Sequence, residues 1–303
     1  MKKAYILLVH KNPDQVCRLI QRLGDGNSVF FVHLDKKTES PDFQIVFDLG
    51  SYVNRVENVY TNWGEYSIVQ ATLNCLTSVR DSGERFDRVI LLSGQDYPIK
   101  NNQEIDAFFS SSPFSIFIEY FSIPNHDKWH PNGGLYRVNK YFRGLAKPQK
   151  YAAKALNFLA LVSPMFGRKM PAGMEPYAGS GWWVMDMYAV EFILTYILHN
   201  PSYASFHRHT FAADEVFFQM LLLNAHDEKI KRSISPDNLR FIKWRDKRSA
   251  HPEVIVKEDL KSILQSEALF ARKFDLVEDT EIFDLIDDHC LSEDSFKQHP
   301  LAQ

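Results

Sequence analysis

The stretch AYILLVHKNPDQVCRLIQRLGDGNSVFFVHLD (residues 4–35) decides the fold. Residues 4–10 form an apolar run, and residues 13–23 then place apolar side chains at helical spacing until Gly24 ends the helix. Residues 29–35 are a second apolar run that ends in Asp35. Two buried strands joined by a helix form a βαβ unit, which predicts a parallel sheet.

The same alternation continues along the chain. A helix is expected around 66–79, and the apolar run 88–92 leads into SGQDYP (93–98). Further on we expect four more elements: a strand at 181–186, helices at 188–199 and 214–223, and a strand at 239–244. The fold class is therefore α/β, with a Rossmann-like, mainly parallel sheet and helices on both faces. Ligands are expected beyond the carboxyl ends of its strands.

Composition limits the kinds of partner. The 303 residues are 45% hydrophobic and 24% charged, which is enough for a sizeable core. A formal charge of −3 and a pI near 6.4 give no global basic field, so nucleic acid is not an expected partner. A site for an anion must therefore be built locally.

Cysteine usage and hydropathy predict a cytoplasmic protein. Cys17, Cys75 and Cys290 are too few and too far apart for a disulfide framework. The apolar run before His10 is too short for a signal sequence or a membrane span, and the run 152–167 is interrupted by Lys154. We expect no transmembrane segment, which is compatible with peripheral association with a membrane.

Three motifs contain residues that could bind a ligand or act in catalysis, and each residue could instead have a purely structural role. Asp35 at a strand end can accept hydrogen bonds from a base or ribose, or be a solvated turn residue. Arg272 and Lys273 in ALFARKFD (268–275) suit a phosphate, or form a solvated basic turn. In FAADEVFFQMLL (211–222), Asp214 and Glu215 open a predicted helix, where a carboxylate suits a general base or ordinary capping.

Eight collinear motifs closely resemble the core-2/I-branching β-1,6-N-acetylglucosaminyltransferase and peptide O-xylosyltransferase family. They extend from residue 4 to residue 274, with a gap in the middle. The motifs are AYILLVHKN, VFFVHLDKK, VYTNWGEYSIVQATLNCL, FDRVILLSGQDYPIKNNQEI, GSGWWVMD, DEVFFQMLL, LRFIKW and LFARKFD.

This resemblance implies a GT-A type fold and a metal-independent transfer from a UDP-sugar with inversion of the anomeric centre. Leu8, Asp35 and Tyr60 match residues that contact uridine. Arg272 and Lys273 match the cationic diphosphate site, and Arg248 approximates a second diphosphate-binding arginine across a two-residue gap. Glu215 matches the catalytic base of the branching enzymes.

The sequence also departs from the family pattern. Xylosyltransferases place an aspartate where this chain has Gly181, so Glu215 remains the available base. Extracellular members carry a membrane anchor and many cysteines, unlike this sequence, which looks like a bacterial-type cytoplasmic relative. Metal-dependent sugar transferases present two acidic residues one apart after a core strand, whereas SGQDYP offers only Asp96. We therefore expect no divalent metal and no cofactor.

The resulting hypothesis is a transferase that moves N-acetylglucosamine or xylose from a UDP-sugar to a glycan or lipid-linked saccharide. Asp96, Trp182 and Trp244 are candidate contacts to sugar or acceptor, and Trp183 is a further stacking face unless it packs in the core. Two alternatives remain: a metal-dependent transferase that uses Asp96, and a catalytically silent protein that binds sugar nucleotides or glycans.

One glycosyltransferase domain is predicted over 1–303. Residues 1–121 form its nucleotide-binding half, and residues 177–275 form its catalytic and diphosphate-binding half. Between them, 122–176 is a variable insertion on the acceptor side, with one helix candidate at 151–162. Residues 276–303 form a C-terminal tail.

Overall fold

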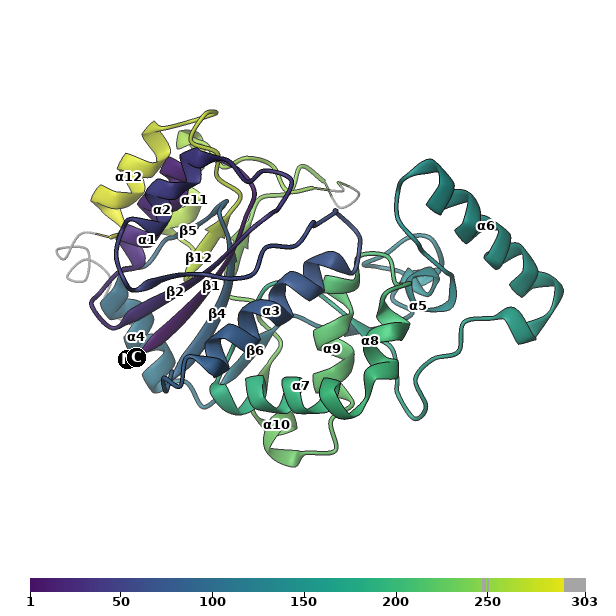
Figure 1. Cartoon of the computed structure of the whole chain (residues 1–303). Helices are drawn as coiled ribbons and strands as arrows, with labels where there is room; N and C mark the ends of the chain where they lie inside the picture. Colours follow the sequence, from purple (N-terminus) through teal and green to yellow (C-terminus); the bar gives the residue numbers. More distant parts are fainter. Residues whose placement is uncertain (247–248, 250, 292–303) are drawn as a thin grey trace. The chain divides into compact units, whose positions relative to one another are not determined.

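The computed structural model describes residues 1–246, 249 and 251–291, and Figure 1 labels its helices and several of its strands. The chain divides into two compact units, each assembled from separate stretches of sequence. Unit 1 contains Met1–Val56, Arg85–Ser115 and Leu239–Gln303, and unit 2 contains Glu57–Glu84 and Ile116–Asn238.

Unit 1 contains four parallel strands in the order β4-β1-β2-β3. These strands are β1 (Lys3–Val9), β2 (Ser28–Leu34), β3 (Val53–Arg55) and β4 (Arg88–Ser93). Almost every residue of β1 and β2 is buried, as expected for parallel strands covered on both faces. The predicted parallel sheet is confirmed.

The helices of unit 1 include the one predicted between the first two strands. In α1, Val16, Leu19, Ile20 and Leu23 are fully buried, and Pro13 occupies the first turn, where its missing N–H costs nothing. The helices are α1 (Pro13–Leu23), α2 (Gln44–Phe47), α4 (Asn102–Ser111), α11 (Leu260–Leu264) and α12 (Glu281–His289), with 3-10 turns η1 (Pro41–Phe43) and η5 (Lys257–Asp259).

A second, three-stranded sheet in unit 1 has the order β11-β12-β5. Its strands are β5 (Asp96–Pro98), β11 (Arg240–Ile242) and β12 (Phe270–Arg272). β12 runs antiparallel to β5, and their register places Arg272 opposite Asp96. This pairing joins the SGQDYP turn to the C-terminal basic motif.

Unit 2 contains strands in the order β10-β6-β9 and a small antiparallel pair, β7 with β8. These are β6 (Ile116–Ile118), β7 (Phe121–Ser122), β8 (Tyr177–Ala178), β9 (Trp183–Met185) and β10 (Ile234–Ser235). The 3-10 turns are η2 (Asn132–Gly134), η3 (Pro164–Phe166) and η4 (Ala213–Glu215).

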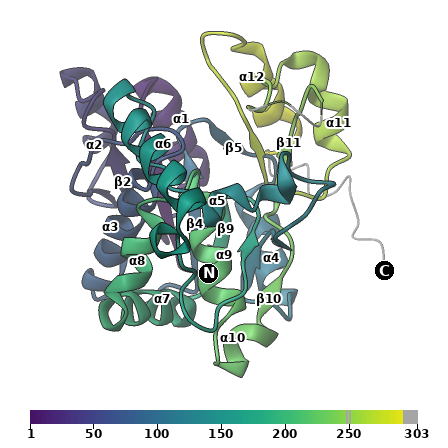
Figure 2. The same cartoon turned by 90° about the vertical axis from the view of Figure 1, so that its right-hand side faces the viewer.

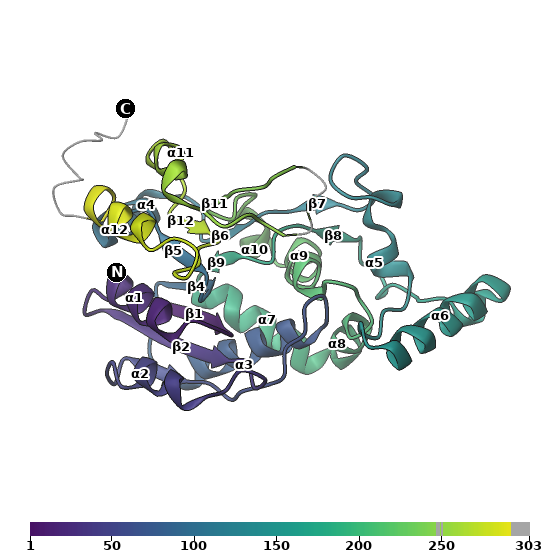
Figure 3. The same ribbon diagram turned by 90° about the horizontal axis from the view of Figure 1, so that it is seen from above.

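Seven helices of unit 2 lie in the described part of the chain. They are α3 (Ser67–Asp81), α5 (Tyr136–Asn139), α6 (Lys147–Val162), α7 (Met187–His199), α8 (Pro201–His207), α9 (Phe217–Leu223) and α10 (Glu228–Arg232). Within this unit α6 lies apart from α7 and α9: it is at the outer end in Figures 1 and 3 and faces the viewer in Figure 2. None of the described helices is long and apolar enough to cross a bilayer.

The predicted strands and helices are confirmed to within a few residues, with one correction. We expected a single helix over 214–223, but the chain forms the 3-10 turn η4 and then α9, with a break at Val216 (φ −128°, ψ −39°). Ala212 before the turn is left-handed (φ 48°), which sets the new chain direction. Glu215 therefore precedes the α-helix and does not lie in its first turn, where the sequence pattern had placed it.

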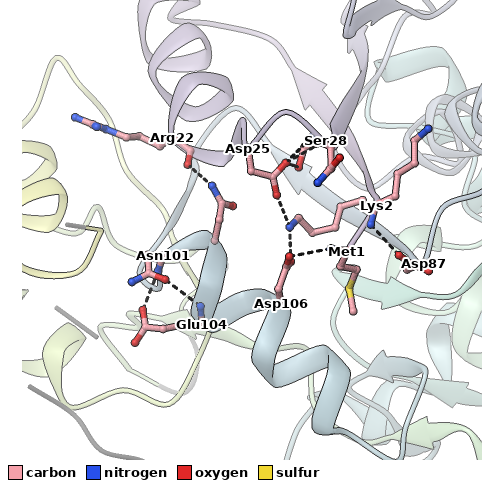
Figure 4. A network of polar contacts seen from close by, with 12 residues as sticks. Met1, Lys2, Arg22, Asp25, Ser28, Asp87, Asn101, Glu104 and Asp106 are labelled. Carbon is pink, nitrogen blue, oxygen red and sulfur yellow. Dashed lines mark hydrogen bonds and ion pairs between the residues drawn. The ribbon is translucent and has the colours of Figure 1, made fainter. Parts of the chain in front are cut away.

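A buried cation, Lys3, ties the first strand of unit 1 to Asp25 and Asp106, two carboxylates that are labelled in Figure 4. Its side chain is 0% exposed and pairs with Asp25 after α1 (2.7 Å) and with Asp106 of α4. Burial alone would raise the pKa of Asp25, but hydrogen bonds from Lys3 and Ser28 overcome this and lower it. A buried ammonium needs nearby carboxylates to offset the free-energy cost of removing its charge from water.

We expect Lys3→Met to lower the free energy of unfolding by roughly 2–4 kcal/mol at pH 7, because Asp25 loses its cation and Asp106 keeps only the N-terminal ammonium, 3.1 Å away. The low end of that range reflects the partial exposure of Asp106 (29%). Since the folded-state pKa of Asp25 is depressed, its contribution is present above the pKa of the unfolded chain and is lost as pH falls through the folded pKa. Urea unfolding at neutral and acidic pH measures both effects.

The matched control is Lys2→Met, whose residue is only partly buried and whose ammonium lies 5.7 Å from the ring of Phe86. It should change stability by only about 0.5 kcal/mol. Equal stabilities for the Lys3 and Lys2 variants would show that the buried pair does not hold β1 in place.

Candidate active site

The carboxyl ends of the parallel strands in unit 1 bring Leu8 and Asp35 to one edge. The N–H of Asp35 donates to Val9 O (2.8 Å), and the N–H of Gly94 donates to Leu8 O (3.1 Å). The carboxylate of Asp35 is 4% exposed, accepts from the Lys37 N–H (2.9 Å) and lies 3.5 Å from the Lys37 ammonium. The strand ends thus place a carboxylate, a backbone turn and a lysine at the sheet edge.

Asp96 is buried beneath this edge. Its Oδ2 accepts from the N–H of Ser93 (2.7 Å) and from the Ser93 hydroxyl, and its Oδ1 lies 3.6 Å from Arg272 Nε. With a side chain that is 0% exposed, Asp96 fixes the turn and Arg272 instead of offering an oxygen to a sugar or a metal. Within residues 1–246, 249 and 251–291, no cluster of three His, Cys, Asp or Glu side chains could hold a metal.

Arg272 and Lys273 follow directly from the end of β12, and the segment after them is held from several sides. Phe274 N–H donates to Gln95 O (2.8 Å), and the N–H of Ile255 donates to Lys273 O (2.9 Å). The fully buried amide of Gln15 donates to Gly94 O (2.8 Å) and Phe274 O (3.2 Å). The basic motif is therefore part of a rigid framework and is not a solvated turn.

The charges around Lys273 favour an anionic ligand. Burial lowers the pKa of Lys273, and the neighbouring cations Lys11 and Arg272 lower it further, while Asp275 acts in the opposite direction. The Lys11 ammonium pairs with Asp275, which also accepts from the Asn12 side chain (2.8 Å). Three cations thus share one small region, and a bound anion would relieve their mutual repulsion.

Lys273 also lines a cavity of about 640 Å³ in unit 1. The other lining residues are Lys243, Arg245, Ser249, His251, Pro252, Glu253 and Val254. Trp244 follows β11 and is 49% exposed. Arg248, the predicted second diphosphate-binding arginine, lies outside the described residues.

Glu215 is in unit 2, where it pairs with an arginine that the sequence did not single out. Arg137 Nη1 donates to Glu215 Oε2 at 2.5 Å. The Arg137 side chain is 9% exposed and its guanidinium stacks 3.6 Å from the ring centre of Trp129, whereas the Glu215 side chain is 36% exposed. The pair therefore orients a carboxylate that still reaches the surface.

The backbone around Glu215 is equally constrained. Its N–H donates to Ala212 O (3.1 Å), and its carbonyl accepts from the Gly179 N–H (2.9 Å). A Cβ at Gly179 would lie 1.8 Å from Glu119 O, so only glycine allows this approach. The first glycine of GSGWW thus has a structural role beside the candidate base.

The second glycine of this motif faces Asp214. A Cβ at Gly181 would lie 3.1 Å from Asp214 Oδ2, so an aspartate at 181 would bring two carboxylates together. Trp183 is fully buried against Phe218 (5.5 Å between ring centres), which makes it a core residue. Trp182 is partly exposed, and Tyr60, which also belongs to unit 2, is 59% exposed.

Sequence patterns missed Arg137 because it lies in the irregular part of the chain between 122 and 176. Its position depends on tertiary contacts: Gly134 (φ 86°) makes room for Trp129, and Arg168 donates to Arg137 O (2.8 Å). Arg168 stacks on Phe206 at 3.9 Å and also donates to Phe206 O (2.7 Å). Burial lowers the pKa of Arg168 to about 10.

A parallel sheet with a fixed cationic site beyond its strand ends defines an α/β protein equipped to bind an anionic ligand. The sequence profile of the family described as Core-2/I-Branching enzyme matches residues 3–264. The chain belongs to this family of glycosyltransferases.

Three relatives illustrate the similarity, each 25% identical to this chain. Xylosyltransferase 2 of Rattus norvegicus matches 94% of the chain and 33% of its own length. A beta-glucuronosyltransferase of Arabidopsis thaliana matches 99% and 67%, respectively. An N-acetyllactosaminide beta-1,6-N-acetylglucosaminyl-transferase of Mus musculus matches 90% and 68%. The chain thus spans about a third of the length of the xylosyltransferase.

Among solved structures, a putative glucose-1-phosphate thymidylyltransferase from Bacillus anthracis overlaps 63% of this chain and 74% of its own. The sequence identity is 14% and the TM-score is 0.29.

Because the pKa of Lys273 is lowered in the folded protein, its charged form opposes folding at neutral pH. This cost is present below the folded pKa and is relieved as pH rises through it. Lys273→Met should therefore be at least as stable as the wild type at pH 7 and lose that advantage in alkaline solution. Urea unfolding at both pH values tests this, and a marked loss of stability at pH 7 would assign Lys273 a structural role.

Proposed function

We propose that this chain is a glycosyltransferase that moves a sugar from a UDP-sugar to a hydroxyl acceptor in one inverting displacement that needs no divalent metal. The observation that carries the proposal is the rigid cationic site formed by Arg272, Lys273 and Lys11 at the sheet edge. Such a site can balance the charge that develops on a departing diphosphate.

The donor would be held mainly through its diphosphate. Arg272 can contact two phosphate oxygens at once, and Lys273 adds a compact charge. Leu8, Asp35 and Tyr60 are assigned to the uridine through their match to the family motifs. The fixed geometry of Arg272 against Asp96 means that little reorganisation is needed when the donor binds.

Glu215 would act as the general base. It would take the proton from the acceptor hydroxyl as that oxygen attacks the anomeric carbon, while UDP leaves from the opposite face. Arg137 orients the carboxylate, and the 36% exposure of the Glu215 side chain leaves it accessible to an acceptor. Base catalysis of this kind is worth roughly 10²–10⁴-fold.

The names of two relatives suggest N-acetylglucosamine or xylose as the transferred sugar. We propose a glycan or lipid-linked saccharide as the acceptor. No disulfide joins Cys17, Cys75 or Cys290, all of which lie in the described part of the chain. We propose a reducing, cytoplasmic setting for the reaction.

The diphosphate site predicts that UDP binding survives chelation of metals, because protein cations supply the compensating charge. We expect the same dissociation constant for UDP by calorimetry in EDTA and in Mn²⁺. Binding that disappears in EDTA and returns with Mn²⁺ would refute metal independence.

The base assignment predicts that Glu215→Gln lowers transfer by about 10²-fold or more, because the amide cannot accept the proton. UDP affinity should barely change, since Glu215 is not assigned to the donor diphosphate. Turnover, UDP affinity and melting temperature are measured on the same variant.

Glu228→Gln, in the exposed α10, is the matched control and should leave turnover unchanged. Near-normal turnover of Glu215→Gln with a lowered melting temperature would make Glu215 structural and move the search for the base to Asp214. A variant that retains UDP binding but loses transfer would also exclude a protein that only binds sugar nucleotides.

A further inference from the structure

Residues 145–166, comprising α6 and η3, expose an unusual amount of apolar surface. Seventeen large hydrophobic side chains are exposed in the described chain, and eight of them fall within these 22 residues. Leu161, Met165 and Val162 are 85%, 75% and 70% exposed. The others are Leu145, Tyr151, Phe158, Leu159 and Phe166. A contiguous apolar surface of this kind normally marks an interaction site.

The apolar side chains are arranged along one face of α6. Tyr151, Phe158 and Val162 are separated by seven and four residues, which places them in a single stripe. Ala153, the buried residue of this helix, lies on the opposite side. Asn157 attaches the helix by bonding both the N–H and the carbonyl of Tyr141 (2.7 and 2.9 Å). The stripe therefore faces away from the part of unit 2 that holds α6.

The sequence around α6 is strongly basic. Residues 128–174 contain nine Lys and Arg and no Asp or Glu, in a chain whose formal net charge is −3. On α6, Lys147, Lys150 and Lys154 are spaced by three and four residues and flank the apolar stripe. All three are exposed. The partner must accept apolar side chains and supply negative charge at the same surface.

We infer that α6 and η3 dock on an anionic lipid bilayer, with the helix lying in the plane of the membrane surface. Such helices insert an apolar face to the level of the headgroups while flanking lysines contact anionic lipids. A second copy of this chain fits less well, because its matching face would bring the same excess of positive charge.

This inference does not depend on the assignment of Glu215, but it would place the proposed reaction at a membrane surface. A transferase seated on a membrane would meet acceptors that are anchored in the same bilayer. Failure of membrane binding would leave the diphosphate and base assignments untouched, and failure of those assignments would leave the membrane surface in place.

The test is co-sedimentation of the full chain with vesicles of phosphatidylcholine alone, or with about 30% phosphatidylglycerol, at about 150 mM salt. We expect binding to the anionic vesicles only, weakened by added salt. Each lysine near an anionic surface strengthens binding by roughly fivefold. The triple variant Lys147→Glu, Lys150→Glu and Lys154→Glu should therefore bind at least about a hundredfold more weakly.

A second variant tests the apolar contribution separately. Phe158→Ser together with Leu161→Ser removes two exposed side chains from the helix and should weaken binding by roughly tenfold or more. Because these residues are exposed, melting temperature should not fall in either variant, and circular dichroism confirms that both are folded.

The matched controls make the same changes elsewhere in unit 2. Lys229→Glu, Lys231→Glu and Arg232→Glu on α10 alter the net charge equally, and Leu198→Ser on α7 removes a side chain that is 76% exposed. Both controls should bind vesicles like the wild type.

Three outcomes would overturn the proposal. The wild type could fail to bind anionic vesicles. The α10 control could lose as much affinity as the α6 lysine variant, which would show that binding depends on net charge alone. Sedimentation velocity could also reveal a dimer that the serine variant abolishes, which would assign this face to a second copy of the chain.

Discussion

The pairing of Asp96 with Arg272 is the constraint on which the candidate donor site depends. A buried carboxylate needs compensating charge and hydrogen bonds, and Asp96 obtains them from Ser93 and from an arginine on an antiparallel strand. The same pairing places Lys273 beside Lys11 and next to the cavity. The ion pair that compensates the buried Asp96 thus also fixes the position of Arg272 and Lys273.

In unit 2 a carboxylate is likewise held by an arginine, but here the carboxylate is partly exposed and the arginine is buried. Glu215 is held by a buried arginine that stacks on Trp129, and Arg168 fixes the backbone of that arginine. Carbonyl oxygens and a threonine hydroxyl accept hydrogen bonds from the guanidinium of Arg168, so this half-buried cation is held by neutral oxygen atoms. The excess positive charge remains at the surface, where it accompanies the exposed apolar face of α6.

The amino-acid sequence by itself determined the elements and the class of fold. The apolar runs at 4–10, 29–35 and 88–92, with helices between them, are sufficient for a parallel sheet because side-chain periodicity is a local property. The order of the motifs indicated the family, which the profile match over 3–264 confirms. Local patterns failed at 214–223, where a left-handed Ala212 and the break at Val216 separate Glu215 from α9.

The partners of the candidate site residues were decided only by the tertiary structure. The sequence predicted Asp96 as a candidate metal ligand or sugar contact. In the structure Asp96 is buried opposite Arg272, because the strand register brings together two segments that are remote in sequence. No sequence pattern distinguishes Arg137, because it lies in an irregular segment. Packing that requires glycine in this segment places Arg137 beside Glu215. Periodicity predicts which residues form a helix or a strand, whereas ion pairs, burial and exposed faces depend on which segments meet in space.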